Sequence, residues 1–345
     1  MARVLLKARP TEPQLADRLA EPTPPGLELY LDAVDLEDAG RLDRLAARLR
    51  ELRPHPRFVY VVEGPVRSLD GSFFDLSANS EPNRECLRRV ADLAAGIGSE
   101  AILVHAIAPM SLEAPLGPEL RRAKLQQSLP LVEYYVELAR ERGLVPLLEN
   151  IPPVARQREA SYMCTPMGMS SRDLVYFAER FPGLGVAVDL SHAQLFLNGL
   201  RISPSAVSPE LAPLVRYLSG FDDSPEMDEY LRAVEPFLFE AHVSNARGLL
   251  EEGLPYGEGD LDLDALASRL AGSLRYLVTE TLEPDADRGV YMREAQRMLE
   301  DALANPPLPS GERLSHPPLP KGEGLSPHPP LPLGEGRGEG QEPRP

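Results

Sequence analysis

The sequence predicts an α/β protein built as a single (β/α)8 barrel, and two observations carry this prediction. The first is a series of eight short apolar runs separated by helix-compatible sequence, because strands and helices that alternate in this number close a barrel of parallel strands. The second is the length, since a barrel of about 250 residues or more absorbs most of the 345-residue chain. The predicted strands are residues 3–7, 27–31, 58–62, 101–105, 145–149, 185–189, 237–242 and 276–280.

Apolar residues at helical spacing mark the helices between these strands. One helix should begin near Ser80, and a second should end at Gly143, with Pro130 kinking or splitting it. Two short helices are expected at 208–219 and 226–235. The loops that would decide substrate specificity are 64–80, 152–170 and 246–260, because each follows a predicted strand.

The composition indicates a cytoplasmic protein without a nucleic-acid partner. The formal net charge is −17, from 53 acidic and 36 basic residues, whereas nucleic-acid binding draws its affinity from a basic surface. Cys86 and Cys164 fit no metal or redox spacing and are expected to be buried thiols in a reducing compartment. No apolar run is long enough for a signal peptide or a membrane span.

The sequence does not decide between a monomer and a homo-oligomer. The only lysines are Lys7, Lys124 and Lys321, a scarcity that we attribute to codon composition rather than to function.

Carboxylates and histidines gather at the C-terminal ends of the predicted strands, from the third strand onward. They are Glu63, His105, Glu149, Asp189, His192, His242 and Glu280. In a (β/α)8 barrel these strand ends form the mouth at which the chemistry takes place. Carboxylate oxygens suit hard divalent cations, and imidazole shifts the preference towards manganese, zinc or cobalt, with magnesium as a further option. The sequence therefore predicts a divalent-metal enzyme.

Each of these residues alone also has a structural explanation. Glu149 could pair with an arginine at the top of the barrel, because a charged group at the end of an apolar strand is costly without a partner. His105 could be a hydrogen-bonding neighbour of the metal site rather than a ligand. Four successive strands that each end in a ligand type are harder to obtain by accident.

Five motifs, in their order along residues 1–300, resemble the xylose-isomerase-like barrel superfamily. They are LeuLeuGluAsnIlePro, ValAlaValAspLeuSerHisAla, AlaHisValSerAsn, TyrGlyGluGlyAspLeuAsp and ValThrGluThr. This superfamily contains sugar and sugar-phosphate isomerases and epimerases, and also the endonuclease IV-type abasic-site nucleases. The resemblance implies that one metal ion is held by four residues, which are Glu149, Asp189, His242 and Glu280.

For the isomerase branch, the resemblance implies a substrate that is a sugar, a sugar phosphate or a related polyhydroxy compound. A metal ion bound to neighbouring hydroxyl and carbonyl oxygens acidifies the carbon between them. Glu149 and Glu280 match the groups that remove and return the proton. The metal stabilises the resulting enediolate, and His192, Arg247 and His105 match substrate-contacting positions.

For the nuclease branch, the resemblance implies more ligands than this sequence supplies. His105 and His192 match two metal histidines of that branch. Glu63 stands in place of a third histidine, and Glu251 and Gly253 stand in place of an aspartate–histidine pair. A trinuclear cluster is therefore not expected.

Two further readings stay open beside the isomerase or epimerase. A metal-dependent phosphodiesterase of the endonuclease IV type is the alternative enzyme, and a barrel that binds metal without catalysis is the third. A second metal ion held by Glu63, His105 and Glu149 is compatible with either enzyme, because glutamate is a competent ligand.

The sequence changes character at Asn305. ProProLeuPro occurs three times in 306–345 and glycines follow each copy. Proline removes backbone donors and glycine raises the entropic cost of ordering, so this composition is typical of disorder. We expect a barrel domain at 1–304 and a disordered low-complexity tail at 305–345; the less favoured alternative for the tail is a polyproline II ligand.

Truncation after Ala304 should leave the melting temperature and the metal content unchanged, because 306–345 has four basic and five acidic residues and few apolar side chains to bury. The last predicted helix, 289–304, must be kept, since it covers the last strand. Thermal denaturation and elemental analysis of both forms measure this. A loss of more than about 1 kcal/mol in the free energy of unfolding would mean that the tail docks on the barrel.

Overall fold

The computed structural model describes residues 2–156 and 162–305, and eight parallel strands in this part close into a barrel. All eight strands were predicted, with ends that differ by at most one residue from those observed. The predicted tail lies outside the described residues, apart from Asn305. In order around the barrel, the strands are β1 (Arg3–Ala8), β2 (Gly26–Tyr30), β3 (Val59–Glu63), β4 (Ala101–His105), β6 (Val145–Glu149), β9 (Gly185–Asp189), β10 (Leu238–Val243) and β13 (Tyr276–Thr279).

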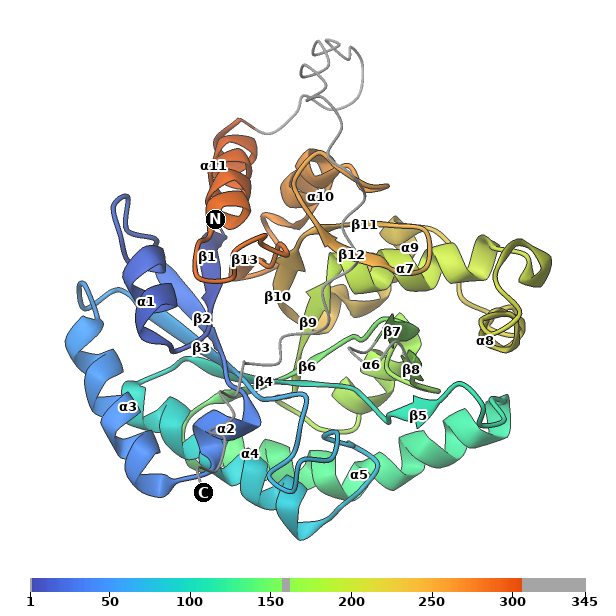
Figure 1. Cartoon of the computed structure of the whole chain (residues 1–345), viewed down its shortest axis with the longest axis horizontal. Coiled ribbons are helices and arrows are strands. Elements are labelled where there is room, and N and C mark those ends of the chain that lie inside the picture. Colours follow the sequence, from blue (N-terminus) through green and yellow to red (C-terminus); the bar gives the residue numbers. More distant parts are fainter. Residues whose placement is uncertain (1, 157–161, 306–345) are drawn as a thin grey trace, which may run out of the picture.

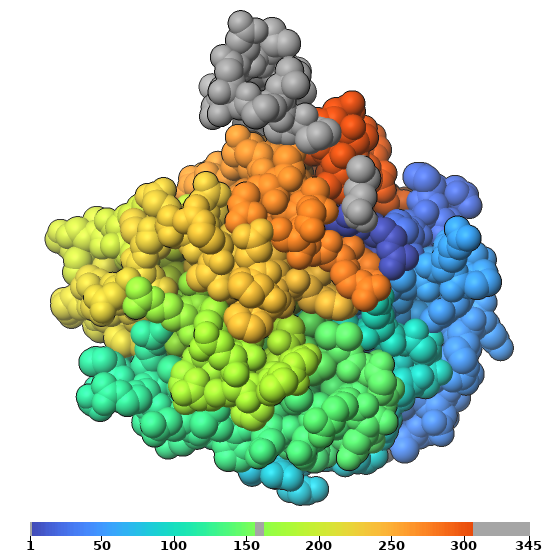
Figure 2. Space-filling model, turned by 180° about the vertical axis from the view of Figure 1, so that it is seen from behind, coloured from blue at the N-terminus to red at the C-terminus, as the bar shows by residue number. Residues whose placement is uncertain are grey.

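Helices surround the strands and cover the outside of the barrel (Figure 1). Seen from the opposite side, consecutive segments lie next to one another, and the N-terminal segment meets the C-terminal one (Figure 2), as the pairing of β1 with β13 requires. The helices are α1 (Glu12–Arg18), α2 (Ala33–Leu36), α3 (Ala39–Leu52), α4 (Glu81–Ile97), α5 (Pro118–Glu141), α6 (Ser171–Ala178), α7 (Leu190–Arg201), α8 (Ala212–Leu218), α9 (Met227–Val234), α10 (Leu263–Leu270) and α11 (Val290–Ala304).

The helix predictions agree with the structure, and of the two outcomes expected at Pro130, a kink or a split, the structure contradicts the split. Ser80 caps α4 by accepting a hydrogen bond from the Asn83 amide, and Gly143 follows α5 with a φ of 69°. The two short helices predicted in the least regular region are α8 and α9. Pro130 does not split α5, which runs without a break across it. Its missing donor costs one intrahelical hydrogen bond, and the neighbouring Leu131 and Val132 are fully buried in the core.

Alternation along the strands divides the core into two parts. Inside the barrel lies a small cluster of apolar side chains, which are Leu5, Val61, Ala101, Leu103, Leu147, Ala187, Tyr276 and Val278. The residues between them, such as Leu6, Val62 and Ile102, point outward into the larger core under the helices. The same inward-facing rows continue towards the C-terminal ends of the strands, where they become polar. The apolar cluster is thus the floor of a polar barrel mouth.

Short strands extend the mouth beyond the barrel. Met110–Ser111 (β5), Val154–Arg156 (β7) and Tyr162–Cys164 (β8) form a three-stranded sheet after β4 and β6. Gly168 anchors the end of this segment with a φ of +85°, and a Cβ there would lie 1.8 Å from the Ala106 carbonyl oxygen. Only glycine fits so close an approach of two backbone segments.

Two expectations from composition can be compared with the described residues. Cys86 and Cys164 are buried free thiols, as predicted. Within the described part of the chain, no helix has the length and apolar character needed to cross a membrane.

Candidate metal centre

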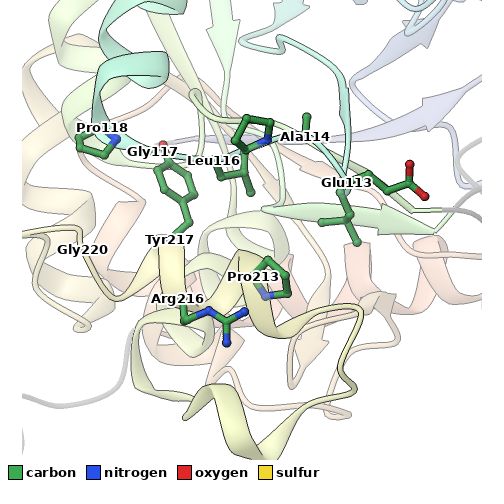
Figure 3. Close-up of a pocket in the computed structure, with 11 residues that line it drawn as sticks. Glu113, Ala114, Leu116, Gly117, Pro118, Pro213, Arg216, Tyr217 and Gly220 are labelled. Atoms are coloured by element: carbon green, nitrogen blue, oxygen red, sulfur yellow. The ribbon is translucent and has the colours of Figure 1, made fainter.

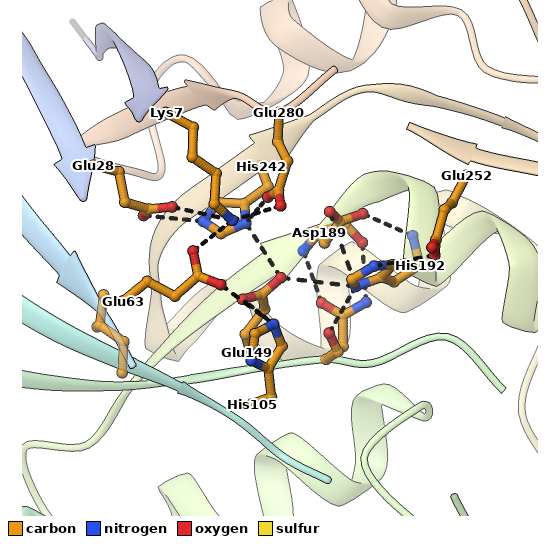
Figure 4. A network of polar contacts seen from close by, with 12 residues as sticks. Lys7, Glu28, Glu63, His105, Glu149, Asp189, His192, His242, Glu252 and Glu280 are labelled. Atoms are coloured by element: carbon orange, nitrogen blue, oxygen red, sulfur yellow. Dashed lines mark hydrogen bonds and ion pairs between the residues drawn. The ribbon is translucent and has the colours of Figure 1, made fainter. Parts of the chain in front are cut away.

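The inward-facing residues at the strand ends converge on one cluster of carboxylates and imidazoles (Figure 4). The strongest candidate ligand group offers one ligand atom from each of Glu149, Asp189, His242 and Glu280, all within 4.8 Å of one another. These four residues close four strands that are adjacent in the barrel, in the order β6, β9, β10 and β13. The structure therefore brings together the four residues that the sequence motifs single out as metal ligands.

Glu149 lies at the middle of the cluster and is fully buried. Its Oε1 atom is 3.2 Å from Nδ1 of His242, and its Oε2 atom is 3.3 Å from Nε2 of His105. The side chain has this position because Leu147, two residues earlier, points into the apolar floor. Glu149 thus faces a different imidazole with each of its oxygens.

His242 is held between carboxylates on both sides of its ring. Nε2 lies 3.1 Å from Oε2 of Glu28, a buried residue of β2 on the opposite wall of the barrel. Nδ1 lies 2.6 Å from Oε2 of Glu280. A carboxylate on the far nitrogen of a metal-binding histidine fixes its ring and its tautomer, so Glu28 orients Nδ1 towards the candidate ligands.

Asp189 and His192 are positioned together at the start of α7. Oδ1 of Asp189 accepts a hydrogen bond from the His192 amide at 2.7 Å and so caps the helix. Asn150 joins this arrangement to Glu149, because its side chain exchanges hydrogen bonds with the Asp189 backbone. The Asn150 carbonyl oxygen lies 3.0 Å from Nδ1 of His192. Nε2 of His192 faces Glu252, 3.5 Å away on β12 (Glu251–Leu254).

Lys7 brings a positive charge into the cluster from β1. Its ammonium nitrogen is 2.5 Å from Oε2 of Glu63 and 2.5 Å from Oε1 of Glu280, and it is 3.6 Å from Oε1 of Glu28. Only 9% of the side chain is exposed. The residue belongs to the same inward row as Leu5. We attributed the small number of lysines to codon composition, and that interpretation overlooked the position of Lys7 inside the cluster.

Burial and charge act against each other on every group in the cluster. Burial raises the pKa of Glu149, but His242 and His105 outweigh it and lower this pKa to about 2. For Glu280 the effect of burial is likewise outweighed, by Lys7 and then His242, and the pKa lies well below its usual range. Burial lowers the pKa of His242, but Glu28 and Glu149 raise it well above its usual range.

The same opposition between burial and neighbouring charge gives His105 and His192 different pKa values. Burial lowers the pKa of His105, and the nearby Glu149 only partly opposes it. Burial also lowers the pKa of His192, but Asp189 and Glu252 raise it to about 10. Burial raises the pKa of Glu63 well above its usual range, and the Lys7 ammonium opposes that rise only in part. Glu149 and Glu280 are therefore ionised, beside one neutral and two charged imidazoles.

Several buried atoms of the cluster fit a metal ion better than they fit one another. In the part of the chain that the structure describes, Nδ1 of His242, both Glu149 oxygens and Oε2 of Glu280 have no hydrogen-bond partner. Their mutual distances are short, so poor alignment rather than distance prevents the bonds. Buried polar atoms without a hydrogen bond are costly. A cation with carboxylate and imidazole ligands would satisfy them together.

Two smaller groups of potential ligands adjoin the first. Glu63, His105 and Glu149 form one, and Glu28, Glu240 and His242 form the other. The structure thus places Glu63 and His105, both predicted, beside Glu149. It does not place Arg247 in contact with the cluster, because that side chain is half exposed and pairs with Glu251 at 3.3 Å.

Sequence reasoning missed Lys7, Glu28, Glu240 and Glu252, and it named Asn150 only as part of a motif. Lys7 and Glu28 carried a signal that could have found them. Lys7 stands two residues after the inward-facing Leu5, and Glu28 pairs with Lys7 in the barrel register. Glu252 carried none, since its approach to His192 depends on the path of a loop.

Gly253 stands at a position where the nuclease pattern has a metal ligand, and the structure shows why a larger residue does not fit there. Its φ is +66°, and a Cβ would lie 2.5 Å from Cγ of Leu282. A histidine at this position would face both a strained backbone and this contact. Glu251 is exposed beside Arg247. The two positions that depart from the nuclease pattern therefore do not contribute to the cluster.

A separate pocket lies at the edge of the fold, between α8 and the segment that precedes α5 (Figure 3). Its volume is about 530 Å³, and its lining includes Leu112, Leu116, Arg216 and Tyr217. None of the residues that line it belongs to the carboxylate and imidazole cluster. It is therefore distinct from the candidate metal centre.

Comparison with known families fits this geometry. The family model described as xylose isomerase-like TIM barrel matches residues 21–302. The chain belongs to this family. No curated protein sequence matches it significantly.

Solved structures share the fold of this family member at low sequence identity. A D-tagatose 3-epimerase-like protein has a TM-score of 0.57 and 17% identity, over 87% of this chain and 98% of that one. An L-ribulose 3-epimerase has a TM-score of 0.58 and 16% identity, over 88% and 96%. A Thermus thermophilus protein soaked with ZnCl2 has a TM-score of 0.56 and 21% identity, over 87% and 98%. At these identities the likeness shows the fold alone.

Metal binding should release a proton and weaken as the pH falls. The pKa of His242 is raised well above its usual range, so the ring is protonated at neutral pH, whereas a metal ligand must be neutral. Below the raised pKa, the apparent affinity should fall by up to about tenfold per pH unit. Calorimetric titration with Mn²⁺ in buffers of different ionisation enthalpy measures the released proton.

The matched variant for this titration is Glu28→Gln, which removes the carboxylate that contributes most to the charged form of His242. Fewer protons should then be released at the same pH. A binding enthalpy that does not depend on the buffer would contradict the expected proton release.

Proposed function

We propose that this protein is a divalent-metal-dependent isomerase or epimerase of a sugar, a sugar phosphate or a related polyhydroxy compound. One observation carries the proposal: the two glutamates of the candidate ligand group stand at the two ends of an arc of four strands, with Asp189 and His242 between them. A substrate bound in this arc would have a carboxylate at each end. That is the arrangement required to remove a proton from carbon and return it.

Glu149 and Glu280 are suited to exchange that proton. Both are ionised at neutral pH, because neighbouring positive groups lower their pKa values. Each has one oxygen engaged away from the centre: Oε2 of Glu149 faces His105 and Oε1 of Glu280 faces Lys7. The remaining oxygen of each faces Nδ1 of His242. The outward contacts hold both carboxylates in place, so proton transfer requires little reorganisation.

A divalent ion held by the four-residue group would polarise neighbouring hydroxyl and carbonyl oxygens of the substrate and so acidify the carbon between them. His192 supports the same reaction as a charged hydrogen-bond donor, since its pKa is about 10 and its Nε2 faces the mouth beside Glu252. Arg247 and His105 remain proposed substrate contacts. For Arg247 this requires that its exposed side chain leaves Glu251.

The solved structures with the same fold support this choice of reaction, because one of those compared is named a sugar epimerase and another is named epimerase-like. A third was soaked with ZnCl2. The ligand set does not single out one metal; manganese, zinc and cobalt suit mixed carboxylate and imidazole ligands, and magnesium is a further option.

A phosphodiesterase of the endonuclease IV type is the second candidate, and the group formed by Glu63, His105 and Glu149 favours it. Two neighbouring metal ions suit phosphodiester cleavage. The net charge of −17 opposes it, as do Gly253 and the exposed Glu251.

The isomerase proposal predicts exchange of carbon-bound hydrogen with solvent. Protein loaded with Mn²⁺ should incorporate deuterium from D2O into at least one member of a panel of keto- and aldo-sugars, followed by NMR. Glu149→Gln and Glu280→Gln should each slow this exchange by at least about a hundredfold, because general acid–base groups contribute about this much. Metal content is measured in parallel, so that loss of metal and loss of the proton-transfer group can be distinguished.

Glu235→Gln is the matched control, since Glu235 pairs with Arg269 outside the centre. It should exchange at the rate of the unaltered protein. Metal-loaded protein that exchanges no hydrogen on any member of the panel would instead favour a barrel that binds metal without catalysis.

The proposal also predicts that the pure protein does not efficiently cleave DNA at abasic sites. Its net charge is −17, and of the two positions that depart from the nuclease pattern, Glu251 is exposed and Gly253 has no side chain. Incubation of an abasic-site duplex with metal-loaded protein tests this on a gel. Robust cleavage that disappears in Glu149→Gln would make the nuclease the better assignment.

A further inference from the structure

Lys7 is a charged residue of the mouth, and the proposed reaction uses its contact with Glu280 but not its contact with Glu63. Its ammonium lies between Glu63 and Glu280, 2.5 Å from an oxygen of each. Burial by itself would favour a neutral amine. Oxygens of three carboxylates lie within 3.6 Å of its nitrogen, so Lys7 is a paired ammonium group in the interior of the cluster.

The carboxylate oxygens of the mouth divide the cluster into two half-sites that share Glu149. In the first, Oε1 of Glu149 and Oε2 of Glu280 face Nδ1 of His242. In the second, Oε2 of Glu149 and Oε1 of Glu63 face Nε2 of His105, at 3.3 and 3.5 Å. We call these the His242 half-site and the His105 half-site.

The His105 half-site has the side chains that a second divalent ion would need. Glu63, His105 and Glu149 are all buried, and their ligand atoms lie within 4.8 Å of one another. Two carboxylates and one imidazole form a sufficient set of protein ligands for such an ion. These three residues therefore do not explain by themselves why the centre should hold only one ion.

Lys7 supplies that explanation. Its ammonium engages the second oxygen of Glu63 and so supplies the positive charge that this half-site requires. On the other side it contacts Oε1 of Glu280 and lies 3.6 Å from Glu28, and both contacts leave Oε2 of Glu280 directed at Nδ1 of His242. A divalent ion at the His105 half-site would be repelled by an ammonium a few ångströms away in a water-poor interior, where charges interact strongly.

We propose that Lys7 is the resident cation of the His105 half-site and limits the centre to one divalent ion, bound at the His242 half-site. This inference rests on the proposed metal centre and goes beyond it. Lys7 is then a residue that selects the class of reaction. One metal ion flanked by two glutamates suits proton transfer at carbon, whereas paired ions suit in-line displacement at phosphorus.

The test replaces the ammonium and keeps the length of the side chain. Unaltered protein, stripped with a chelator and titrated with Mn²⁺, should bind about one ion per chain, and Lys7→Met should bind about two. Elemental analysis gives the stoichiometry. Electron paramagnetic resonance provides a readout independent of activity, because two neighbouring Mn²⁺ ions give an exchange-coupled spectrum that a single ion does not.

Three further variants show whether the additional ion occupies the expected place. Lys7→Arg keeps a cation and should bind one ion. Lys7→Met combined with Glu63→Gln should also return to one, because the second half-site then lacks a carboxylate. Lys124→Met is the matched control, since Lys124 contacts Ser77 and Asp75 outside the cluster. It should bind one ion.

A second measurement does not depend on the folding of Lys7→Met. In the unaltered background, His105→Ala should change the Mn²⁺ affinity by less than about threefold, whereas His242→Ala should reduce it by at least about tenfold. Equal losses in the two variants would place the ion across both half-sites and overturn the inference.

The outcomes separate this inference from the proposed function. One ion in both the unaltered protein and folded Lys7→Met overturns the role of Lys7 and leaves the isomerase proposal standing. Two ions in the unaltered protein overturn the role of Lys7 as well. Unaltered protein that binds no divalent ion overturns the metal centre itself and this inference with it.

Discussion

Carboxylates that are buried together must be balanced by positive charge, and this requirement organises the upper half of the barrel. Glu28, Glu63, Glu149, Asp189 and Glu240 are all nearly or fully buried. Ionised carboxylates are costly in such surroundings unless each has a partner. Lys7 and three imidazoles provide partners for Glu28, Glu63, Glu149 and Asp189, whereas burial and the neighbouring Glu28 raise the pKa of Glu240 well above its usual range. A divalent ion would add to this balance. The carboxylate and imidazole atoms that need positive charge are therefore the same atoms that could bind a metal ion.

The period of two along the strands is what makes this arrangement possible. Val61 and Glu63 point to the same side, as do Leu147 and Glu149, so one row supplies both the apolar floor and the polar mouth. A shift of one residue in β6 or β9 would exchange Glu149 or Asp189 for the outward-facing Leu148 or Val188. Parallel pairing around a closed barrel fixes that register at each neighbour. The fold and the site are therefore specified by the same pattern.

This common origin explains how much the sequence could predict. The strands were predicted nearly to the residue, because apolar runs of about five residues alternate with amphipathic helices. Glu149, Asp189, His242 and Glu280 followed, since a ligand at the end of an apolar strand is conspicuous. Glu28 was missed because it lies within a strand flanked by leucines, and such a strand alone does not show which face is interior; the pairing of Glu28 with Lys7 of β1 does show it.

The contacts of loop residues could not be predicted from the sequence for a different reason. The contact of Glu252 with His192 joins segments that are far apart in the sequence through a hairpin, so no local pattern encodes it. The exposed position of Arg247, which the family motif associates with substrate, likewise depends on how that hairpin turns. Local sequence specifies which side chains a strand end presents, but long-range packing decides which loop residues come to meet them.

Asp189 is both the N-cap of α7 and a candidate metal ligand, and this combination limits how the centre can be redesigned. One oxygen of its carboxylate closes the first turn of α7, so the side chain must be short and must accept a hydrogen bond. Asparagine would keep the cap and lose the charge, while histidine or cysteine would lose the cap. Glu280 instead makes its contacts with the side chains of Lys7 and His242, which can adjust without disturbing a helix. A change of ligand type intended to alter metal preference therefore disturbs the helix at residue 189 but not at residue 280, where it would instead remove a proposed proton-transfer group.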